Sequence, residues 1–576
     1  MTAHGRAAIL LTVLCFVVYG NVLAGEFVWD DHLQVVRNLN IRSLANLPRA
    51  FTTSLWSFAY STEADTHDRN FDRYYRPLQT VFYIIGYRIG GLSPVAYHAI
   101  NVVLHSAASL LIYFLCIQLG LSAPVGVISA ALFAVHPVHT EAVSWIAGVG
   151  DVSAAVFYFG GLFTFLRYLK DRRMSWLWAS AACLFAALLS KEMAATLPLV
   201  ALLLLFRVPK KRRPAIQDAA FMILPFVAAV AVYAVLRIRA VGSGIPSVER
   251  GAASLFDWVT LGVWAAGNYL RYVVIPFPLY VYHLVPLQLA DRILSTSVAA
   301  AVVLTSIVIA WRLRNRLPQV WLWLAVFGTT LLPVLYFRGI SGGFLFAERY
   351  MYIPSMAAVI LAGFLLARLS PQRAIAIGSV IVLVFAVMTL QRNRDWRTEE
   401  RLFQSALRQQ PEAVTIWANL GEVHLRHQDR ARAQDAFTNA LEHMDDRRFF
   451  RASDDVYRTY LGLGTIAFQE MKPMEAVDYL QMALEINPQG HEAYTQLGGV
   501  LINFGANYRD AAGFLEKAVK LSAVNEVARY YLGVALFNLG RPDDAIQYFR
   551  EALQLNPELE AAKQYLDLAL KSKGAR

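Results

Sequence analysis

Long apolar runs separated by short polar segments fill the first two thirds of the chain. About 20 apolar residues suffice for a helix to cross the hydrocarbon core of a bilayer, and runs of this length recur from Ala7 to about Leu390. The pattern therefore predicts about eleven membrane-spanning helices. We expect them near residues 7–24, 95–119, 123–140, 151–169, 175–190, 193–206, 217–236, 295–311, 319–337, 350–368 and 373–390.

Two other apolar stretches do not fit this series. Residues 77–91 are short for a span, and residues 256–276 contain Gly267, Asn268 and Arg271. We expect both to form helices that lie in the outer interface of the bilayer or dip into it.

Beyond about Gln391 the sequence becomes polar, charged and periodic. A Leu-Gly pair begins a frame at Leu420, Leu463 and Leu532, and an Ala, a large apolar residue and a second Ala follow it at fixed offsets. A further copy begins at Leu497 and carries one extra residue in its turn, GANYRD. Such frames are typical of tetratricopeptide repeats, in which small residues let two helices approach and large residues fill the gaps.

The two patterns together predict an all-α protein with two domains. Residues 1–390 form a multispanning membrane bundle with a first outer loop at 25–77, and residues 391–576 form an α-solenoid. Within the solenoid we expect a half repeat at 396–411, repeats near 413–446, 454–489, 490–524 and 525–558, and a solvating cap at 559–573.

Arrays of this kind normally bind an extended peptide or a helix along their concave face. Asn503 and Asn538 occupy equivalent positions of consecutive repeats. Paired amides at such positions could hold the backbone of an acceptor peptide. The alternative is that both are ordinary solvated asparagines.

The net charge of +11 comes largely from basic residues in short loops between apolar runs. The loops are residues 170–173, 207–213 and 312–316, and the one that holds Arg368 and Arg373. Basic loops mark the cytoplasmic side of a membrane protein, so the charge indicates topology and we expect no nucleic-acid partner. The N-terminus is then cytoplasmic, whereas the first loop and the repeats are extracytoplasmic.

The first apolar run follows Arg6 and could be a cleaved signal peptide. Because many spans follow it, we expect an uncleaved first helix instead. The three cysteines all lie inside apolar runs and predict neither a disulfide framework nor a zinc site.

Two adjacent carboxylates, Asp30 and Asp31, stand where the first apolar run ends, directly after Phe27, Val28 and Trp29. On the predicted topology this segment reaches the outer surface of the bilayer. Partial burial of two neighbouring like charges raises the pKa of one carboxyl group, which suits a general base. The alternative is that one aspartate caps a helix through residues 32–37, and the sequence leaves both interpretations open.

Further ionisable residues gather at predicted outer helix ends. They are Arg76, His136, His139, Glu141, Asp151, Lys191, Glu192, Glu348 and Arg349. Ionisable groups are costly at membrane depth, so a set that converges on one side of a bundle predicts a functional site. Alternatively, Lys191 with Glu192, and Glu348 with Arg349, form local charge pairs.

The spacing of His136 and His139 could place two metal ligands on one helical face. Pro137 breaks a regular helix between them, however, and neither a cysteine nor an Asp-x-Asp motif of the membrane half supports a metal site. We therefore predict no metal and no other cofactor, and we expect both histidines to hydrogen-bond to a substrate or to a neighbouring span.

Several segments, taken in order, resemble the transmembrane and tetratricopeptide-repeat-containing O-mannosyltransferases, which are GT-C type glycosyltransferases. These segments are FVWDDHLQVVRN, YYRPLQT, YHAINVVLHSAASLLIY, LFAVHPVHTEAVSWIAGVGD, SKEMAATLPL and AERYMYIPS, followed by the repeats. The resemblance covers nearly the whole chain, and the short array resembles a bacterial or otherwise minimal relative.

The resemblance implies inverting, metal-independent transfer of a hexose such as mannose. The donor would be a polyprenyl-phosphate sugar, and the acceptor a Ser or Thr hydroxyl of a protein that the repeats recruit. Because an acidic residue of the first outer loop acts at the acceptor in such enzymes, the resemblance assigns that role to Asp30 and Asp31.

The resemblance also calls for cations and polar groups at the donor phosphate and sugar. The candidate cations, in falling order, are Arg349, Lys191 and Arg76, with Glu348, His136, His139 and Glu141 beside them. The protein would lie in a bacterial inner membrane with periplasmic repeats or, in a eukaryote, in the endoplasmic reticulum with luminal repeats.

Two other classes of function stay open at this stage: a non-catalytic membrane-anchored scaffold and a transporter of lipid-linked sugars. Ionisable residues halfway along the spans would favour transport, whereas those found here lie mostly at outer helix ends. A pure scaffold would need neither so many spans nor the pair Asp30 and Asp31. The sequence therefore favours a transferase.

Overall fold

The computed structural model describes residues 2–59, 74–207, 216–242, 254–286, 288–335, 345–444, 453–505 and 507–574. Part of the predicted first outer loop, part of the basic loop at 207–213 and the stretch after the first repeat lie outside the described residues. Within these ranges the structure has helices and no strands, so the all-α prediction is confirmed.

The described residues fall into two compact units, one that ends at Ser405 and one that starts at Ala406. We call them the membrane unit and the repeat unit. Residues 391–405, which the sequence pattern assigns to the repeats, belong to the membrane unit. Trp396 and Phe403, which are 2% and 1% exposed, anchor this segment.

Seven helices of the described residues are long and apolar enough to cross a membrane. They are Ala3–Ala24 (α1, Ala3–Tyr19, with a 3-10 turn), Pro94–Gln118 (α5), Ile146–Asp171 (containing α8, Val149–Asp171), Phe221–Val241 (within α11, Ile216–Val241), Leu289–Leu313 (α13), Pro318–Leu335 (α14) and Pro371–Trp396 (containing α16, Pro371–Arg392). A bent pair, Ala123–Ala134 (α6) and Pro137–Ser144 (containing α7, Thr140–Ser144), makes an eighth candidate with a bend of 48°.

The remaining predicted spans are shorter helices. Met174–Ser190 (α9) and Ser355–Leu366 (α15) are apolar but short, and the span predicted at 193–206 contains Leu197–Leu204 (α10) between two 3-10 turns. The sequence pattern overestimates span length here because 3-10 turns form at Glu192–Thr196 and Glu348–Met351, beside polar residues. Among the described residues, seven or eight helices thus have full spanning length, where the sequence predicts about eleven.

The two stretches predicted to lie at the interface also form helices. Pro77–Gly90 (α4) has 14 residues, and Leu255–Val274 (α12) has 20 residues with Asp257 near its start and Arg271 near its end. Neither is among the spanning candidates. Their placement at the interface stays a prediction.

The membrane unit has inner and outer helices. The span that contains α8 is 72% buried within the protein and packs against α5 and α9, whereas the span α13 is only 17% buried. The outer helices present large apolar side chains such as Leu294, Leu304 and Leu383, which are more than half exposed. Such surfaces are suited to lipid contact.

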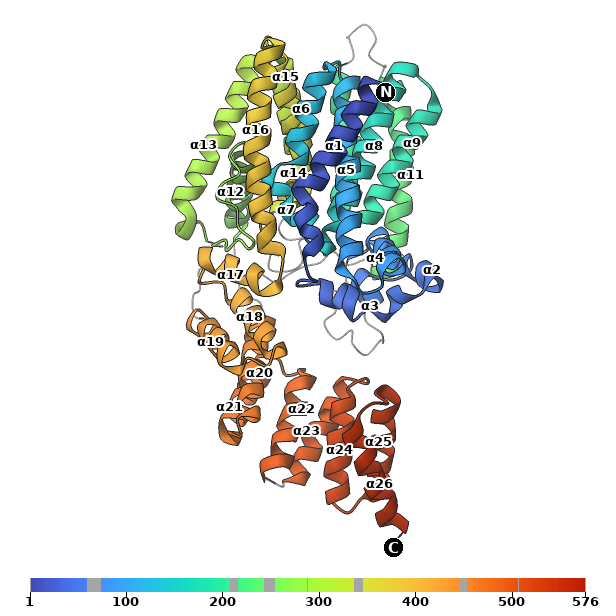
Figure 1. Cartoon of the computed structure of the whole chain (residues 1–576), viewed down its shortest axis with the longest axis vertical. Coiled ribbons are helices and arrows are strands. Elements are labelled where there is room, and N and C mark those ends of the chain that lie inside the picture. The colour runs from blue at the N-terminus through green and yellow to red at the C-terminus, as the bar shows by residue number, and fades with distance from the viewer. Residues whose placement is uncertain are drawn as a thin grey trace. The chain divides into compact units, whose positions relative to one another are not determined.

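One end of the membrane unit is built from short helices. After α1, the chain forms turns and the helices Leu47–Ala50 (α2) and Leu55–Ala59 (α3), which lie with α4 at the lower end of this unit in Figure 1, opposite the N-terminus. The segment that holds Asp30 and Asp31 leads directly into this layer. The layer positions the site described below.

The repeat unit consists of paired helices. The pairs are α18 (Val414–Arg426) with α19 (Arg430–Glu442), α20 (Ser453–Gln469) with α21 (Pro473–Ile486), α22 (His491–Val500) with α23 (Tyr508–Leu521), and α24 (Glu526–Asn538) with α25 (Pro542–Leu555), followed by α26 (Glu560–Gly574). A Cβ atom on Gly421 would lie 2.6 Å from Phe437, and one on Gly533 would lie 2.6 Å from Phe549. This close approach explains the small and large residues of the frame.

The extra residue of the third repeat is taken up in a widened helical turn. Leu501–Gly505 at the end of α22 is a π-helix, whose hydrogen bonds span five residues instead of the four of an α-helix. The repeat prediction is therefore confirmed, with a physical account of its irregular copy.

Candidate active site

The aspartate segment follows α1 and a 3-10 turn at Gly20–Ala24. Trp29 adopts φ +57°, in the left-handed region that bulky residues rarely occupy. The chain then turns so that the backbone oxygen of Asp30 accepts hydrogen bonds from Leu33 and Gln34. This turn places the two aspartate side chains in different environments.

Asp31 is fully buried and has two backbone donors. Its Oδ2 accepts a hydrogen bond from the Val28 amide at 3.0 Å, and its Oδ1 accepts one from the Ala147 amide at 2.9 Å. It makes no side-chain cap on the helix His32–Val36 that follows. Burial raises the pKa of Asp31 well above its usual value, against these two hydrogen bonds. Asp31 thus ties the segment to the start of the span that contains α8.

Asp30 is partly exposed, and its carboxylate makes no hydrogen bond within the part of the chain that the structure describes. Burial raises its pKa to about 6, while the charges of Arg349 and Arg76 act in the opposite direction. A carboxylate with this pKa and no fixed partner can accept a proton at neutral pH. Of the two aspartates, Asp30 has the properties of a general base.

The two cations that act on this carboxylate, Arg76 and Arg349, also act on Lys191, and each of the three cations forms an ion pair. Arg76 donates from Nη2 to Oε2 of Glu192 at 3.0 Å, Lys191 contacts both oxygens of Asp151 at 2.6 Å, and Arg349 pairs with Glu141. The six residues come from segments between positions 76 and 349 that are far apart in the sequence. The fold therefore brings Arg76, Lys191 and Arg349 together, as the sequence predicts for a site.

Charges that are adjacent in the sequence each form an ion pair with a distant residue. Lys191 binds Asp151 while Glu192 binds Arg76, and Arg349 binds Glu141 while Glu348 binds Arg392. Helix ends at these positions point successive side chains to different neighbours. The structure therefore favours these long-range pairs over the alternative of local charge pairs.

Lys191 is 6% exposed, and its surroundings shift its pKa. Burial lowers its pKa to about 8; the partner Asp151 opposes this shift, and the nearby cations Arg76 and Arg349 add to it. Because the two arginines disfavour the charged form of Lys191, added negative charge beside these cations would relieve their repulsion. The site is thus suited to an anionic group such as a phosphate.

Glu348 belongs to a second buried cluster. One of its oxygens accepts a hydrogen bond from the Tyr280 amide at 2.7 Å and lies 3.5 Å from His283 Nε2, and the other accepts from Arg392 at 2.7 Å. Arg392 also donates to the Leu279 backbone oxygen. The carboxylate of Glu348 is therefore engaged in holding the 279–283 segment.

The histidines of the HPVH segment make hydrogen bonds within the protein. His136 Nε2 lies 3.1 Å from the Val273 backbone oxygen, and the two nitrogens of His139 lie 2.8 Å from the Phe133 backbone oxygen and from Ser355 Oγ. His136 thus bonds to α12 and His139 bonds to its own helix pair and to α15, which is consistent with the expectation of hydrogen bonds to neighbouring helices. No group of three or more His, Cys, Asp or Glu side chains suited to a metal ion occurs among the described residues.

Several residues that shape the site escape the sequence reasoning. Gln34 Oε1 accepts from Tyr83 at 2.6 Å and from Gln79 at 3.1 Å, which fixes the helix after the aspartates against α4. Glu399 contacts the aspartate segment from 370 positions away. A polar residue inside an apolar run is a signal that could have identified Gln79, whereas nothing near Glu399 in the sequence indicates its partner.

In the repeat unit, both predicted asparagines are exposed and donate to their own helices. Asn503 Nδ2 bonds to the Gly499 backbone oxygen at 2.7 Å, and Asn538 Nδ2 bonds to the Val534 backbone oxygen at 2.8 Å. One N–H group and the carbonyl oxygen of each amide are not used in these bonds. A role in binding a peptide stays a prediction.

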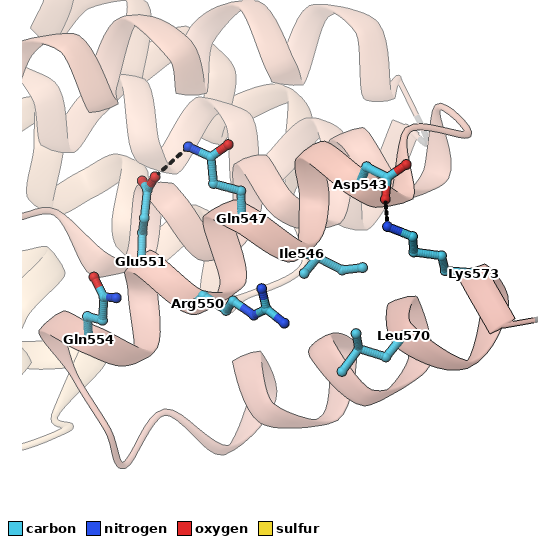
Figure 2. Close-up of a pocket in the computed structure, with 8 residues that line it drawn as sticks. All are labelled: Asp543, Ile546, Gln547, Arg550, Glu551, Gln554, Leu570 and Lys573. Atoms are coloured by element: carbon cyan, nitrogen blue, oxygen red, sulfur yellow. Dashed lines mark hydrogen bonds and ion pairs between the residues drawn. The ribbon is translucent and has the colours of Figure 1, made fainter.

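A hollow of about 480 Å³ lies between α25 and α26, near the end of the array. Figure 2 shows Arg550 and Ile546 facing Leu570 across it, with an ion pair between Asp543 and Lys573 at one end. Neither Asn503 nor Asn538 lines it.

Two family profiles support the repeat assignment. Tetratricopeptide-repeat family profiles match residues 386–443 and 527–559. Among solved structures, YrrB, titled a TPR protein with an unusual peptide-binding site, is 24% identical with a TM-score of 0.24, covering 32% of this chain and 86% of its own. A MamA structure is 22% identical with a TM-score of 0.23, covering 28% and 82%.

Curated relatives match most of the chain. Protein O-mannosyl-transferase TMTC3 of Homo sapiens is 23% identical, covering 94% of this chain and 67% of the human protein, and its Mus musculus counterpart is 24% identical over 93% and 62%. Protein O-mannosyl-transferase F38B6.6 of Caenorhabditis elegans is 25% identical over 73% and 60%. The chain thus spans about two thirds of the length of these relatives. The predicted resemblance is confirmed, because homologues of this chain are named protein O-mannosyl-transferases.

Proposed function

We propose that this chain is an inverting, metal-independent membrane glycosyltransferase of the GT-C type. It transfers a hexose, mannose on the evidence of its relatives' names, from a polyprenyl-phosphate donor to Ser or Thr hydroxyls of a protein. The observation that carries this proposal is the Asp30 carboxylate, which has no hydrogen bond among the described residues, near the cations Arg76 and Arg349, which in turn lie near Lys191. A base next to a cation cluster is what transfer from a phosphate leaving group requires.

We propose that the reaction uses this arrangement in the following way. Asp30 removes the proton of the acceptor hydroxyl as its oxygen attacks the anomeric carbon from the face opposite the phosphate. The bond between that carbon and the phosphate oxygen breaks, and the electron pair leaves with the polyprenyl phosphate. The cations stabilise the negative charge that grows on the leaving group.

The ion pairs hold the cations in place before the reaction. Glu192, Asp151 and Glu141 fix the positions of their partners, so that little reorganisation is needed when charge develops. Arg76 keeps its Nη1 outside its bonds to Glu192, which use Nε and Nη2. That nitrogen can donate to a phosphate oxygen.

The direction of the spans supports an extracytoplasmic site. The span that contains α8 starts beside Asp31, and α16 ends beside Asn21, to which Asn393 donates a hydrogen bond. At 1.5 Å per residue, the other ends of such helices lie roughly 30 Å away. Those far ends carry the basic loops at 170–173 and around Arg373. By the positive-inside rule the site then lies on the side opposite the cytoplasm.

The repeats would bring the acceptor protein to this enzyme. A tetratricopeptide array binds extended peptides, and attachment to the same chain raises the local concentration of a bound acceptor near the site. The exposed amides of Asn503 and Asn538 are the groups we assign to this contact.

The test is transfer by the purified full-length chain in lipid nanodiscs. A polyprenyl-phosphate mannose and a peptide with one Ser are the substrates, and the same peptide with Ser replaced by Ala is the control. The proposal predicts a hexose adduct, of inverted anomeric configuration, on the Ser peptide alone. The proposal is contradicted if no adduct forms although the thermal unfolding transition shows that the protein is folded.

Transfer is expected to depend on pH in a bell shape. Asp30 must be unprotonated, so kcat/KM falls as the pH drops through about 6, and Lys191 must be charged, so kcat/KM falls as the pH rises through about 8. The measurement is the initial rate of transfer from pH 5 to 10 at low donor concentration. The Lys191→Arg variant is the control, because a guanidinium stays protonated and the alkaline limb should disappear. A flat profile in the wild type contradicts this assignment.

A further inference from the structure

Trp29 stands immediately before the proposed base in a conformation that costs free energy. Its φ of +57° is rare for a bulky side chain and is kept only where surrounding contacts impose it. This backbone turn determines where the Asp30 carboxylate points. The contacts that impose it therefore bear on catalysis.

Glu399 makes a polar contact with the Trp29 backbone. Its Oε1 accepts a hydrogen bond from the Trp29 amide at 3.0 Å, and its Oε2 lies 3.3 Å from His32 Nε2. The two partners flank Asp30 and Asp31 on either side. The side chain of Glu399 is only 13% exposed, so these contacts are partly shielded from water.

Neighbours of Glu399 reinforce the same contact. The Trp29 ring packs against Phe403 with centroids 5.4 Å apart, and the Glu26 amide donates to the Arg397 backbone oxygen at 2.9 Å. Residues 397–403 therefore hold residues 26–32 through one carboxylate, one backbone bond and one aromatic pair.

We propose that Glu399 is a positioning residue: it keeps Trp29 in its left-handed conformation and thereby directs the Asp30 carboxylate toward the acceptor hydroxyl. The inference rests on the proposed function, in which Asp30 is the base. Glu399 does not itself touch the reacting atoms. It opens α17 (Glu399–Gln409), the helix that leads along the chain into the repeats.

The test compares Glu399→Ala, Glu399→Gln and the matched control Glu400→Ala in the full-length chain. Two quantities are measured: hydrogen exchange of the peptide that covers residues 26–38, and the kinetics of hexose transfer. Glu399→Ala is expected to speed exchange in this peptide about tenfold or more and to lower kcat about tenfold to a hundredfold, with the KM for the donor nearly unchanged. Gln keeps an oxygen that can accept from the Trp29 amide, so it should restore most of kcat.

Each outcome is decisive. Wild-type exchange in Glu399→Ala overturns the proposal whatever the activity, and so does faster exchange with an unchanged kcat. An equal loss in Glu400→Ala also overturns it, because the effect would then not be specific to the contact. If the wild-type chain transfers no hexose while Glu399→Ala still loosens the segment, the proposed function fails but the structural role of Glu399 does not, so the two failures are distinguishable.

Discussion

The Asp30→Asn variant is expected to lose about 10²- to 10⁴-fold in the rate of hexose transfer while keeping the stability of the wild type. The reason is that Asn has the shape of Asp but cannot accept a proton from the acceptor hydroxyl. Because the Asp30 carboxylate makes no hydrogen bond among the described residues, its replacement removes no structural contact. The measurement is kcat in nanodiscs together with the thermal unfolding transition.

The matched control is Asp31→Asn. Asp31 accepts from the amides of Val28 and Ala147, and an Asn at this buried position can accept from only one of them. Leaving one buried amide without an acceptor costs about 1–3 kcal/mol, so this variant should lower the unfolding temperature more than it affects the chemical step. If instead Asp31→Asn abolishes transfer in a stable protein and Asp30→Asn does not, the division of roles between the two aspartates is wrong.

The Arg349→Met variant is expected to lose both stability and transfer. It leaves Glu141 buried without its ion-pair partner, and breaking a buried pair in this way costs about 3–5 kcal/mol. Loss of a group that stabilises transition-state charge lowers kcat by about 10²- to 10³-fold. Thermal unfolding and transfer rates measure the two effects separately.

The double variant Glu141→Gln with Arg349→Met separates these effects. Gln removes the buried charge but keeps an oxygen that can accept from the backbone amide of residue 349. In the wild type this Arg349 amide donates to Glu141 Oε2 at 2.8 Å. We therefore expect the double variant to recover most of the stability and none of the transfer. Recovery of transfer together with stability would show that Arg349 has only a structural role.

The repeats were readable from the sequence because their signal is local. The frame of small and large residues reports contacts within one helical hairpin, such as Gly421 with Phe437. Even the irregular copy was visible as one extra residue, although only the structure shows that a π-helix absorbs it. The spans were readable for the same reason, since length and apolarity are properties of a single segment.

Span length is less predictable, because hydropathy alone does not show where a helix ends. Glu192 and Glu348 begin 3-10 turns that shorten the neighbouring helices, and Pro137 lies at a bend of 48°. These breaks are also where the site residues stand. The helix breaks that make the predicted number of spans inaccurate are therefore also the positions that carry the site residues.

The site was only partly predictable. Sequence reasoning named Asp30, Arg76, Lys191 and Arg349 as candidates, but it could not choose their partners, because pairing depends on helices far apart in the chain. It also could not separate Asp30 from Asp31, since the difference lies in the amide of Ala147, 116 positions away. Glu399 was out of reach for the same reason.

The most direct test of the account is glycopeptide mass spectrometry on envelope, luminal and secreted proteins of cells that carry the wild-type gene, the Asp30→Asn variant or no copy, with expression of the variant verified. The account predicts hexose on Ser or Thr of specific peptides in the wild type, and its loss both in the deletion and in Asp30→Asn. Unchanged glycopeptides in all three cells would contradict protein O-glycosylation by this chain.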